Sequence, residues 1–191
     1  APGNHDPFVP GGVWEYVCWP DNVCIFRKNA MMSVELPRWN TVVHGAAFTG
    51  PEQGSSLLAG FHAPADGRVH VGLLHGEAET ADSRYDPLGG EEIAASGLAY
   101  LALGHIHKRG QKRYGGTLCA WPGCPEGRGF DELGEKGFYE GTVSDDGAVS
   151  LRFVPFARHR YEVVTVDVTG QAPLAAVEAA LPARGTEGDL Y

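Results

Sequence analysis

The sequence predicts an α/β domain built from short strands, tight turns and few helices. Glycine occurs 27 times in 191 residues, which favours turns over long helices. Leu98 to Leu103 is a nearly continuous apolar run, as expected of a strand covered on both faces. Residues 68–74 alternate, with Val69, Val71 and Leu73 on one face. With 43% hydrophobic residues, the chain can bury a sizeable core.

The same patterns predict each element in chain order. Helices or helical turns are expected at Gly11–Trp19, Glu52–Phe61, Glu91–Ala95 and Pro173–Leu181. Strands are expected at Val23–Phe26, Met31–Leu36, Thr41–Phe48, Arg68–Leu74, Leu98–Leu103, Thr117–Trp121 and Tyr161–Val168. Two more strands, Phe138–Val143 and Ala148–Val154, flank Asp145-Asp146-Gly147, a hairpin signal. The polar stretches Glu77–Gly90, 108–116 and Pro122–Lys136 are expected to be loops.

Composition excludes several classes of protein. No stretch approaches the roughly 18–20 apolar residues that cross a bilayer, so no membrane span is expected. The formal charge of −9 argues against a generally basic nucleic-acid-binding surface. It leaves a phosphate substrate open, because bound divalent cations would be the largest local positive charges. The four cysteines lack the spacing of zinc-binding pairs and are expected to be reduced thiols.

Three short glycine-containing segments carry the residues that suggest chemistry. They are Gly3-Asn4-His5-Asp6, Leu74-His75-Gly76-Glu77 and Gly104-His105-Ile106-His107. His75 and His105 each follow an apolar strand, and ligands of open α/β sheets gather beyond the carboxyl ends of strands. Neutral imidazole and amide oxygen are both good ligands for divalent metals. The three segments together therefore predict a metal-dependent hydrolase.

The spacing of the last segment requires a turn. Two histidines at i and i+2 of a flat strand point to opposite faces, and Gly104 is expected to supply the turn that lets them converge. Each segment alone is more often structural, as a turn or a hydrogen-bonded surface histidine, and it is their conjunction that favours a site. The other histidines lack such a setting and are interpreted as structural: His44, His62, His70 and His159.

These segments resemble a known superfamily. GNHD, a His-Gly at a strand end and GHxH resemble the calcineurin-like metallophosphoesterases. The stretches 101–108, 121–132 and 134–137 are similar to SbcD-type DNA repair exonucleases, and the resemblance covers roughly residues 1–160. It implies a sandwich of two β-sheets flanked by helices. The strand and helix expected after residue 160 are interpreted as the start of a C-terminal capping or DNA-binding domain, at residues 161–191.

The resemblance also implies a mechanism. Asn4, His75 and His105 would bind one metal, and His107 would bind the other. His5 would lie near the scissile phosphate as a candidate catalytic residue, with Asp6 orienting its ring. The implied reaction is phosphodiester hydrolysis by two divalent ions, with manganese as the family's usual metal. The implied partners are DNA, an SbcC-like coiled-coil ATPase and a second copy of the intact protein, in the cytoplasm.

Basic residues near these segments are candidates for substrate contacts. Arg128 lies in the glycine-rich loop and would match the geometry of a phosphate, although a salt bridge to Glu126, Asp131 or Glu132 is an equally good interpretation. The densest basic stretch would touch a DNA backbone or form a solvated loop: Lys108, Arg109, Lys112 and Arg113.

The chain departs from the family pattern in one respect. The upstream DxH and GDxxD motifs, which supply the metal-bridging carboxylate, do not occur in these 191 residues. We therefore expect an N-terminally truncated fragment that lacks the first strands and helices of the fold and is inactive or nearly so alone. Two other functions remain open: a phosphoesterase for nucleotides or small esters, and a non-catalytic remnant that binds a partner.

Overall fold

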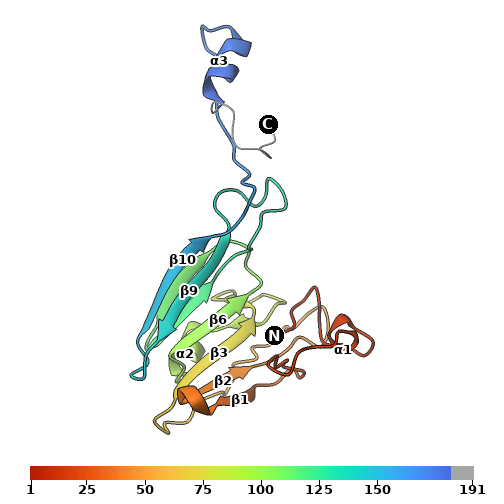
Figure 1. Ribbon diagram of the computed structural model, residues 1–191, viewed down its shortest axis with the longest axis vertical. Coiled ribbons are helices and arrows are strands. Elements are labelled where there is room, and N and C mark those ends of the chain that lie inside the picture. Colours follow the sequence, from red (N-terminus) through yellow and green to blue (C-terminus); the bar gives the residue numbers. More distant parts are fainter. Residues whose placement is uncertain (182–191) are drawn as a thin grey trace.

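The computed structural model describes residues 1–181, which form a mixed α/β architecture (Figure 1). The strands are β1 (Met32–Leu36), β2 (Thr41–Gly45), β3 (Val69–His75), β4 (Glu77–Ala78), β5 (Pro87–Leu88), β6 (Tyr100–Gly104), β7 (Gly110–Tyr114), β8 (Thr117–Trp121), β9 (Gly137–Val143) and β10 (Val149–Pro155). The helices are α1 (Val13–Tyr16), the 3-10 helix η1 (Pro37–Trp39), α2 (Gly90–Ala95) and α3 (Pro173–Ala180). The predicted α/β class is confirmed.

A six-stranded sheet with the order β1-β2-β3-β6-β8-β7 organises the chain. The inner strands β2, β3, β6 and β8 are parallel, whereas β1 and β7 pair antiparallel at the two edges. His75 at the end of β3 pairs with Gly104 at the end of β6. Because parallel strands end at the same edge of a sheet, the residues that follow β3 and β6 meet there. The N-terminus lies beside this edge (Figure 1).

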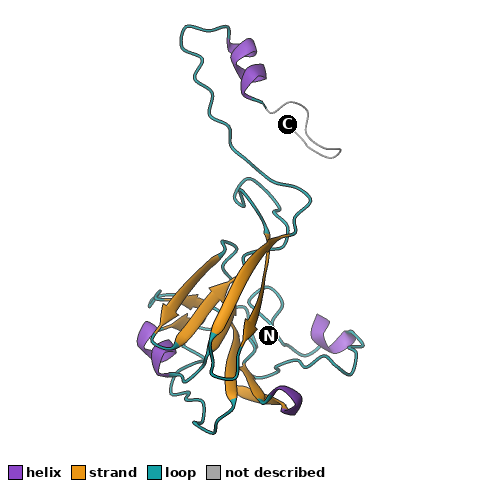
Figure 2. Ribbon diagram, turned by 60° about the vertical axis from the view of Figure 1, so that its left-hand side comes forward, coloured by secondary structure: helices purple, strands orange, loops and turns teal. Residues whose placement is uncertain are grey.

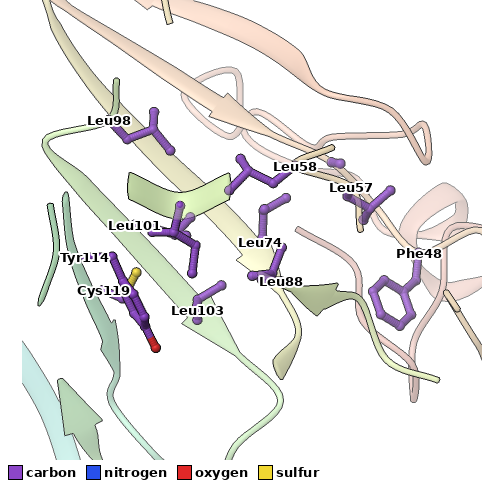
Figure 3. Close-up of a cluster of buried hydrophobic side chains, with 12 residues drawn as sticks. Phe48, Leu57, Leu58, Leu74, Leu88, Leu98, Leu101, Leu103, Tyr114 and Cys119 are labelled. Atoms are coloured by element: carbon purple, nitrogen blue, oxygen red, sulfur yellow. The ribbon is translucent and has the colours of Figure 1, made fainter. Parts of the chain in front are cut away.

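The core packs sheet residues against α2 and against the loops on either side of β3 (Figure 3). Its members are apolar and at most 9% exposed: Ala46, Phe48, Leu57, Leu58, Leu74, Leu88, Ile93, Leu98, Leu101, Leu103, Tyr114 and Cys119. Gly72 of β3 makes room for two of them, because a Cβ there would lie 2.7 Å from Leu101 Cδ1 and 2.8 Å from Leu98 Cδ1. Truncating a leucine in such a core to alanine costs about 2–5 kcal/mol.

The hairpin β9–β10 forms a separate two-stranded sheet beside the main one (Figure 2). The predicted Asp-Asp-Gly turn is confirmed: Gly147 adopts φ +80°, and the Ser144 amide donates to the Ala148 carbonyl at 2.9 Å. The guanidinium of Arg109 lies 3.9 Å from the ring centroid of Phe153, which fastens the hairpin to the residues just before β7.

Two predicted strands are wrong. Val23–Phe26 and Tyr161–Val168 contain β-formers but no strand. Val163 and Val164 are 68% and 48% exposed, so no sheet covers them. A strand needs a neighbour that completes its hydrogen bonds, and local propensity cannot provide one.

Three segments expected to be loop or helix also differ from their predictions. The basic stretch contains β7, an edge strand whose exposed charges hid its pairing with β8. The polar stretch after His75 contains the two-residue strands β4 and β5, which pair with each other. Residues 52–61 form bends and hydrogen-bonded turns and no regular helix.

Residues after β10 extend away from both sheets towards α3 (Figures 1 and 2). Leu174 of α3 is 71% exposed, and the helix ends at Ala180, close to its predicted end. The proposed second domain at 161–191 lies partly outside the described residues, because the structure describes only residues 1–181. Within residues 1–181, no helix combines the length and apolar character needed to cross a membrane.

Candidate metal centre

The three segments singled out in the sequence meet at the carboxyl edge of the sheet. Asn4 Oδ1 lies 2.7 Å from His75 Nε2 and 3.3 Å from His105 Nδ1. The backbone around Phe48, just beyond β2, holds the N-terminal segment in place, because its amide donates to the Pro2 carbonyl and its carbonyl accepts from Phe8. Residues that are 71 and 101 positions apart in the sequence are thus brought together.

Glycines make the room that the His75 ring occupies. A Cβ on Gly3 would lie 2.5 Å from His75 Cε1, and a Cβ on Gly104 would lie 2.8 Å from His75 Nδ1. Our expectation that Gly104 supplies the turn of the last segment is wrong: His105 itself adopts the left-handed conformation, with φ +82°. The glycine is needed because the neighbouring imidazole leaves no space for a side chain.

The environment keeps His75 neutral. Burial, followed by the nearby His105, lowers the pKa of His75 to about 4. Phe48 and His105 both contact its ring edge-to-face, with centroids 5.4 Å and 5.2 Å away. A neutral imidazole is the form that binds metals.

The orientation of His105 is fixed by a residue that the sequence reasoning did not assign. Glu77 Oε1 lies 2.8 Å from His105 Nε2, and the Tyr85 ring packs over His105 with centroids 4.7 Å apart. A carboxylate only accepts hydrogen bonds, so Nε2 of His105 carries a proton, and in the neutral ring Nδ1 is the nitrogen with the lone pair. The only sequence signal for Glu77 was its place two residues after His75.

The donor set of Asn4, His75 and His105 fits a divalent cation. Ligands of one small ion at about 2.1 Å are about 3 Å apart, close to the 2.7 and 3.3 Å found between Asn4 Oδ1 and the two ring nitrogens. In the neutral ring, the lone pair of His105 Nδ1 faces the Asn4 oxygen, and a cation near both atoms would stabilise this arrangement. These three residues would therefore hold one metal ion.

Carboxylates do not complete this set within the described chain. Among residues 1–181, no group of three or more His, Cys, Asp and Glu side chains is arranged to hold a metal. Glu77 binds Nε2 of His105, whereas the nitrogen of His105 that faces Asn4 is Nδ1. The described residues therefore supply part of a metal centre.

His107 lies in a second cluster with Glu132 and Arg128. Its Nδ1 is 2.5 Å from Glu132 Oε1, and the side chain of Glu132 is only 5% exposed. Glu132 Oε2 accepts from the Arg128 amide at 2.8 Å, and Oε1 lies 3.2 Å from Arg128 Nη2. These hydrogen bonds, that of the Arg128 amide above all, hold the pKa of Glu132 well below its usual range.

The structure shows how the remaining candidate residues are paired. Arg128 forms the salt bridge that was the alternative to a phosphate contact, with Glu132 as its partner. Asp6 accepts from the Gly3 amide at 2.9 Å, and no hydrogen bond joins it to the exposed His5 within the described residues. In the basic stretch, Lys112 pairs with Glu79.

Two histidines interpreted as structural form a network that the sequence did not reveal. His44 Nε2 and His70 Nδ1 are 2.8 Å apart, and both rings are buried. Ser33 Oγ lies 2.9 Å from His44 Nδ1, and Asp66 Oδ1 lies 3.0 Å from His70 Nε2. Arg68 in turn binds Asp66. All four cysteines are free thiols, as predicted.

Comparison with known proteins agrees with this geometry. No protein-family model matches the chain. The chain is 30% identical over 172 residues to the uncharacterized metallophosphoesterase YhaO of Bacillus subtilis (strain 168). This similarity supports the metallophosphoesterase superfamily. The alignment covers 87% of the chain but 41% of the relative, so the chain spans about two fifths of that protein's length. The mixed α/β fold with its central sheet is consistent with the calcineurin-like metallophosphoesterase fold.

Proposed function

We propose that this chain is part of a metal-dependent DNA exonuclease of the SbcD type that acts in DNA repair. The observation that carries the proposal is the convergence of Asn4 Oδ1 with His75 Nε2 and His105 Nδ1 at the carboxyl edge of the sheet. This set would hold one divalent ion, and His107 would belong to the site of a second. The expected ions are Mn²⁺, which would supply charge stabilisation and an activated water for phosphodiester hydrolysis.

The rest of the site supports a substrate with a phosphate backbone. His5 is exposed and next to Asn4, where it would lie against the scissile phosphate. Arg128 is 73% exposed beyond its pairing with Glu132, so its guanidinium is open to solvent beside His107. The expected partners remain DNA, an SbcC-like ATPase and a second copy of the protein.

A non-catalytic, partner-binding role is the second candidate, favoured by one observation. The part of the chain that the structure describes lacks a complete cluster of metal-binding side chains. The DxH and GDxxD motifs are also missing from the 191 residues, so we expect this chain by itself to show little or no hydrolysis.

An assay of metal binding and DNA cleavage separates these functions. We expect the 191-residue chain to bind Mn²⁺ in a calorimetric titration, and His75→Ala to weaken binding at least about 10-fold because one ligand is lost. His62→Gln is the control, since His62 is exposed and, among residues 1–181, its side chain bonds only the Ala95 carbonyl. In a protein that combines this chain with both missing motifs, Mn²⁺ should support release of nucleotides from linear DNA.

Three outcomes would contradict the proposed metal centre, the DNA substrate and the expected inactivity of the chain alone, respectively. Equal Mn²⁺ affinity of the native chain and His75→Ala would show that His75 is not a metal ligand, and would contradict the proposed metal centre. Hydrolysis of a small chromogenic diester without cleavage of DNA would favour a phosphoesterase for small esters. Robust manganese-dependent nuclease activity of the 191-residue chain alone would overturn the expected inactivity.

A further inference from the structure

The two histidines of the Gly104–His107 segment each face a carboxylate, but through different ring nitrogens. His105 meets Glu77 through Nε2 at 2.8 Å. His107 meets Glu132 through Nδ1 at 2.5 Å. The two acids come from different places in the chain, β4 and the long loop before β9, so neither pairing is a by-product of the other.

The chemistry of a carboxylate fixes which nitrogen carries the proton. An ionised carboxylate has no hydrogen to donate, so the ring nitrogen that faces it must be the N–H. In a neutral imidazole the other nitrogen then presents its lone pair. His105 therefore offers Nδ1, the atom that faces Asn4 Oδ1, and His107 offers Nε2.

Glu132 is held as a fixed charge. Its side chain is 5% exposed, and the Arg128 amide and guanidinium bind one carboxylate oxygen each. Arg128 Nη2 also lies 3.2 Å from His107 Nδ1. Because both of those atoms carry hydrogens when Glu132 is the acceptor, Arg128 acts on His107 through Glu132 and not by a direct bond.

The backbone of Glu77 is fixed by its hydrogen bonds to the segment around Tyr85 and Asp86. Its amide is within hydrogen-bonding distance of the Tyr85 and Asp86 carbonyls, both at 3.2 Å, and β4 pairs with β5. A side chain on Gly76 would meet the Asp86 carbonyl oxygen at 2.6 Å, so the glycine lets these two segments approach closely. The tyrosine that packs over His105 comes from the same segment as these carbonyls.

We propose that Glu77 and Glu132 are positioning residues that hold His105 and His107 in opposite tautomers, so that the two rings present different nitrogens to metal. The inference rests on the proposed function for the presence of metal, but the tautomers belong to the metal-free chain. Carboxylates behind ligating histidines typically change metal affinity about 10- to 100-fold when removed.

Nuclear magnetic resonance of the metal-free chain tests the tautomers directly. Long-range ¹H–¹⁵N correlation spectra of the ¹⁵N-histidine-labelled chain at neutral pH should show His105 protonated at Nε2 and His107 protonated at Nδ1. Glu132→Ala should shift His107 towards the Nε2–H form that free histidine favours, whereas Glu132→Gln, which keeps a carbonyl acceptor, should retain Nδ1–H. Glu135→Ala is the matched control, because within the described part of the chain Glu135 pairs with Arg109 and Arg160 and with no histidine.

Titration with Mn²⁺ tests the consequence for metal. Glu77→Ala should weaken Mn²⁺ binding about 10- to 100-fold. Glu52→Ala, which removes an exposed partner of Arg84, should leave it unchanged. An Nε2–H form of His107 in the native chain would overturn the proposal. Unchanged Mn²⁺ affinity in Glu77→Ala would overturn it as well. If the tautomers are as stated but the protein that combines this chain with both missing motifs does not cleave DNA, the proposed function is contradicted and this inference stands.

Discussion

Two pairs of histidines lie on or directly after neighbouring parallel strands of the same sheet, and they differ in what their ring nitrogens face. In the pair of His44 and His70, Ser33, the opposite ring and Asp66 bind the ring nitrogens in an unbroken chain. In the pair of His75 and His105, two nitrogens converge on the single oxygen of Asn4.

The difference shows that proximity of histidines does not make a metal site. His70 and His75 belong to the same strand, β3, and both are in contact with a histidine of an adjacent chain segment. Each ring nitrogen of the first pair has a hydrogen-bonding partner, so no lone pair is left for a ligand. In the second pair, one nitrogen of each ring shares the single acceptor Asn4 Oδ1, so a cation that replaced these contacts would find three ligand atoms around one point.

Crowding the second pair should produce the largest effect. Gly3→Ala would place a methyl group 2.5 Å from the His75 ring, so the ring must move away from Asn4. We expect Mn²⁺ affinity to fall about 100-fold, or about 2.7 kcal/mol, in a calorimetric titration. Gly50→Ala is the control, because nothing lies within 4 Å of a Cβ there. Equal affinities of the two variants would show that the His75 ring is not confined by Gly3.

The first pair should instead control stability in acid. Burial, and then the charges of His70 and Arg68, lower the pKa of His44 from 6.5 to about 4, although Asp66 opposes them. The unfolded chain therefore takes up this proton at a higher pH than the folded chain does. The stability that the neutral ring contributes is complete above pH 6.5 and is lost as the pH falls towards 4.

This loss is measurable by urea unfolding at several pH values. We expect the contribution of His44 to fall by about 2 kcal/mol between pH 7 and pH 5. His44→Gln should flatten the dependence of the unfolding free energy on pH, whereas the exposed control His62→Gln should not. A dependence that is unchanged in His44→Gln would show that this ring does not titrate on unfolding.

A smaller and opposite effect is expected from Asp86, next to the second pair. Its side chain is buried, Oδ1 accepts from the Leu57 amide at 2.6 Å, and Oδ2 has no hydrogen-bond partner within the described residues. Burial raises the pKa of Asp86 from 3.8 to about 7. Folding therefore favours the protonated carboxyl, whose contribution is complete below pH 3.8 and is lost as the pH rises from there through 7.

Asp86→Asn removes the charge and keeps an oxygen for the Leu57 amide. Asparagine also tolerates the left-handed φ of +53° at this position. We expect the variant to lose about 1 kcal/mol less stability than the native chain between pH 6 and pH 8 in urea unfolding. A parallel decline of the two proteins over this range would exclude Asp86 as the titrating group.

Much of the second pair was predictable from the sequence. Apolar runs located β3 and β6, and the histidines that follow them were predicted to meet because parallel strands end at one edge of a sheet. Asn4 was a candidate only through the resemblance of its segment to a metallophosphoesterase motif. The roles of Glu77 and Glu132 were missed because an acid in a polar loop carries no signal of the ring that it faces.

The first pair was not predictable, for a related reason. His44 and His70 are 26 residues apart and contact each other only because β2 and β3 are adjacent and in register. The predicted strand at Tyr161–Val168 failed in the same way, because β-formers alone do not provide a partner.

The sequence by itself determined the α/β class, the inner strands and the hairpin turn, and it supplied the candidate metal ligands, because each depends on a local pattern of apolar, glycine and ligand residues. Only the tertiary structure decided which histidines hydrogen-bond to one another and which meet at Asn4, and which acid faces which ring nitrogen. It also decided that Gly104 makes room for the His75 ring and that His105 adopts the left-handed conformation of the turn. Those properties depend on distances between residues far apart in the chain, and local patterns do not encode such distances.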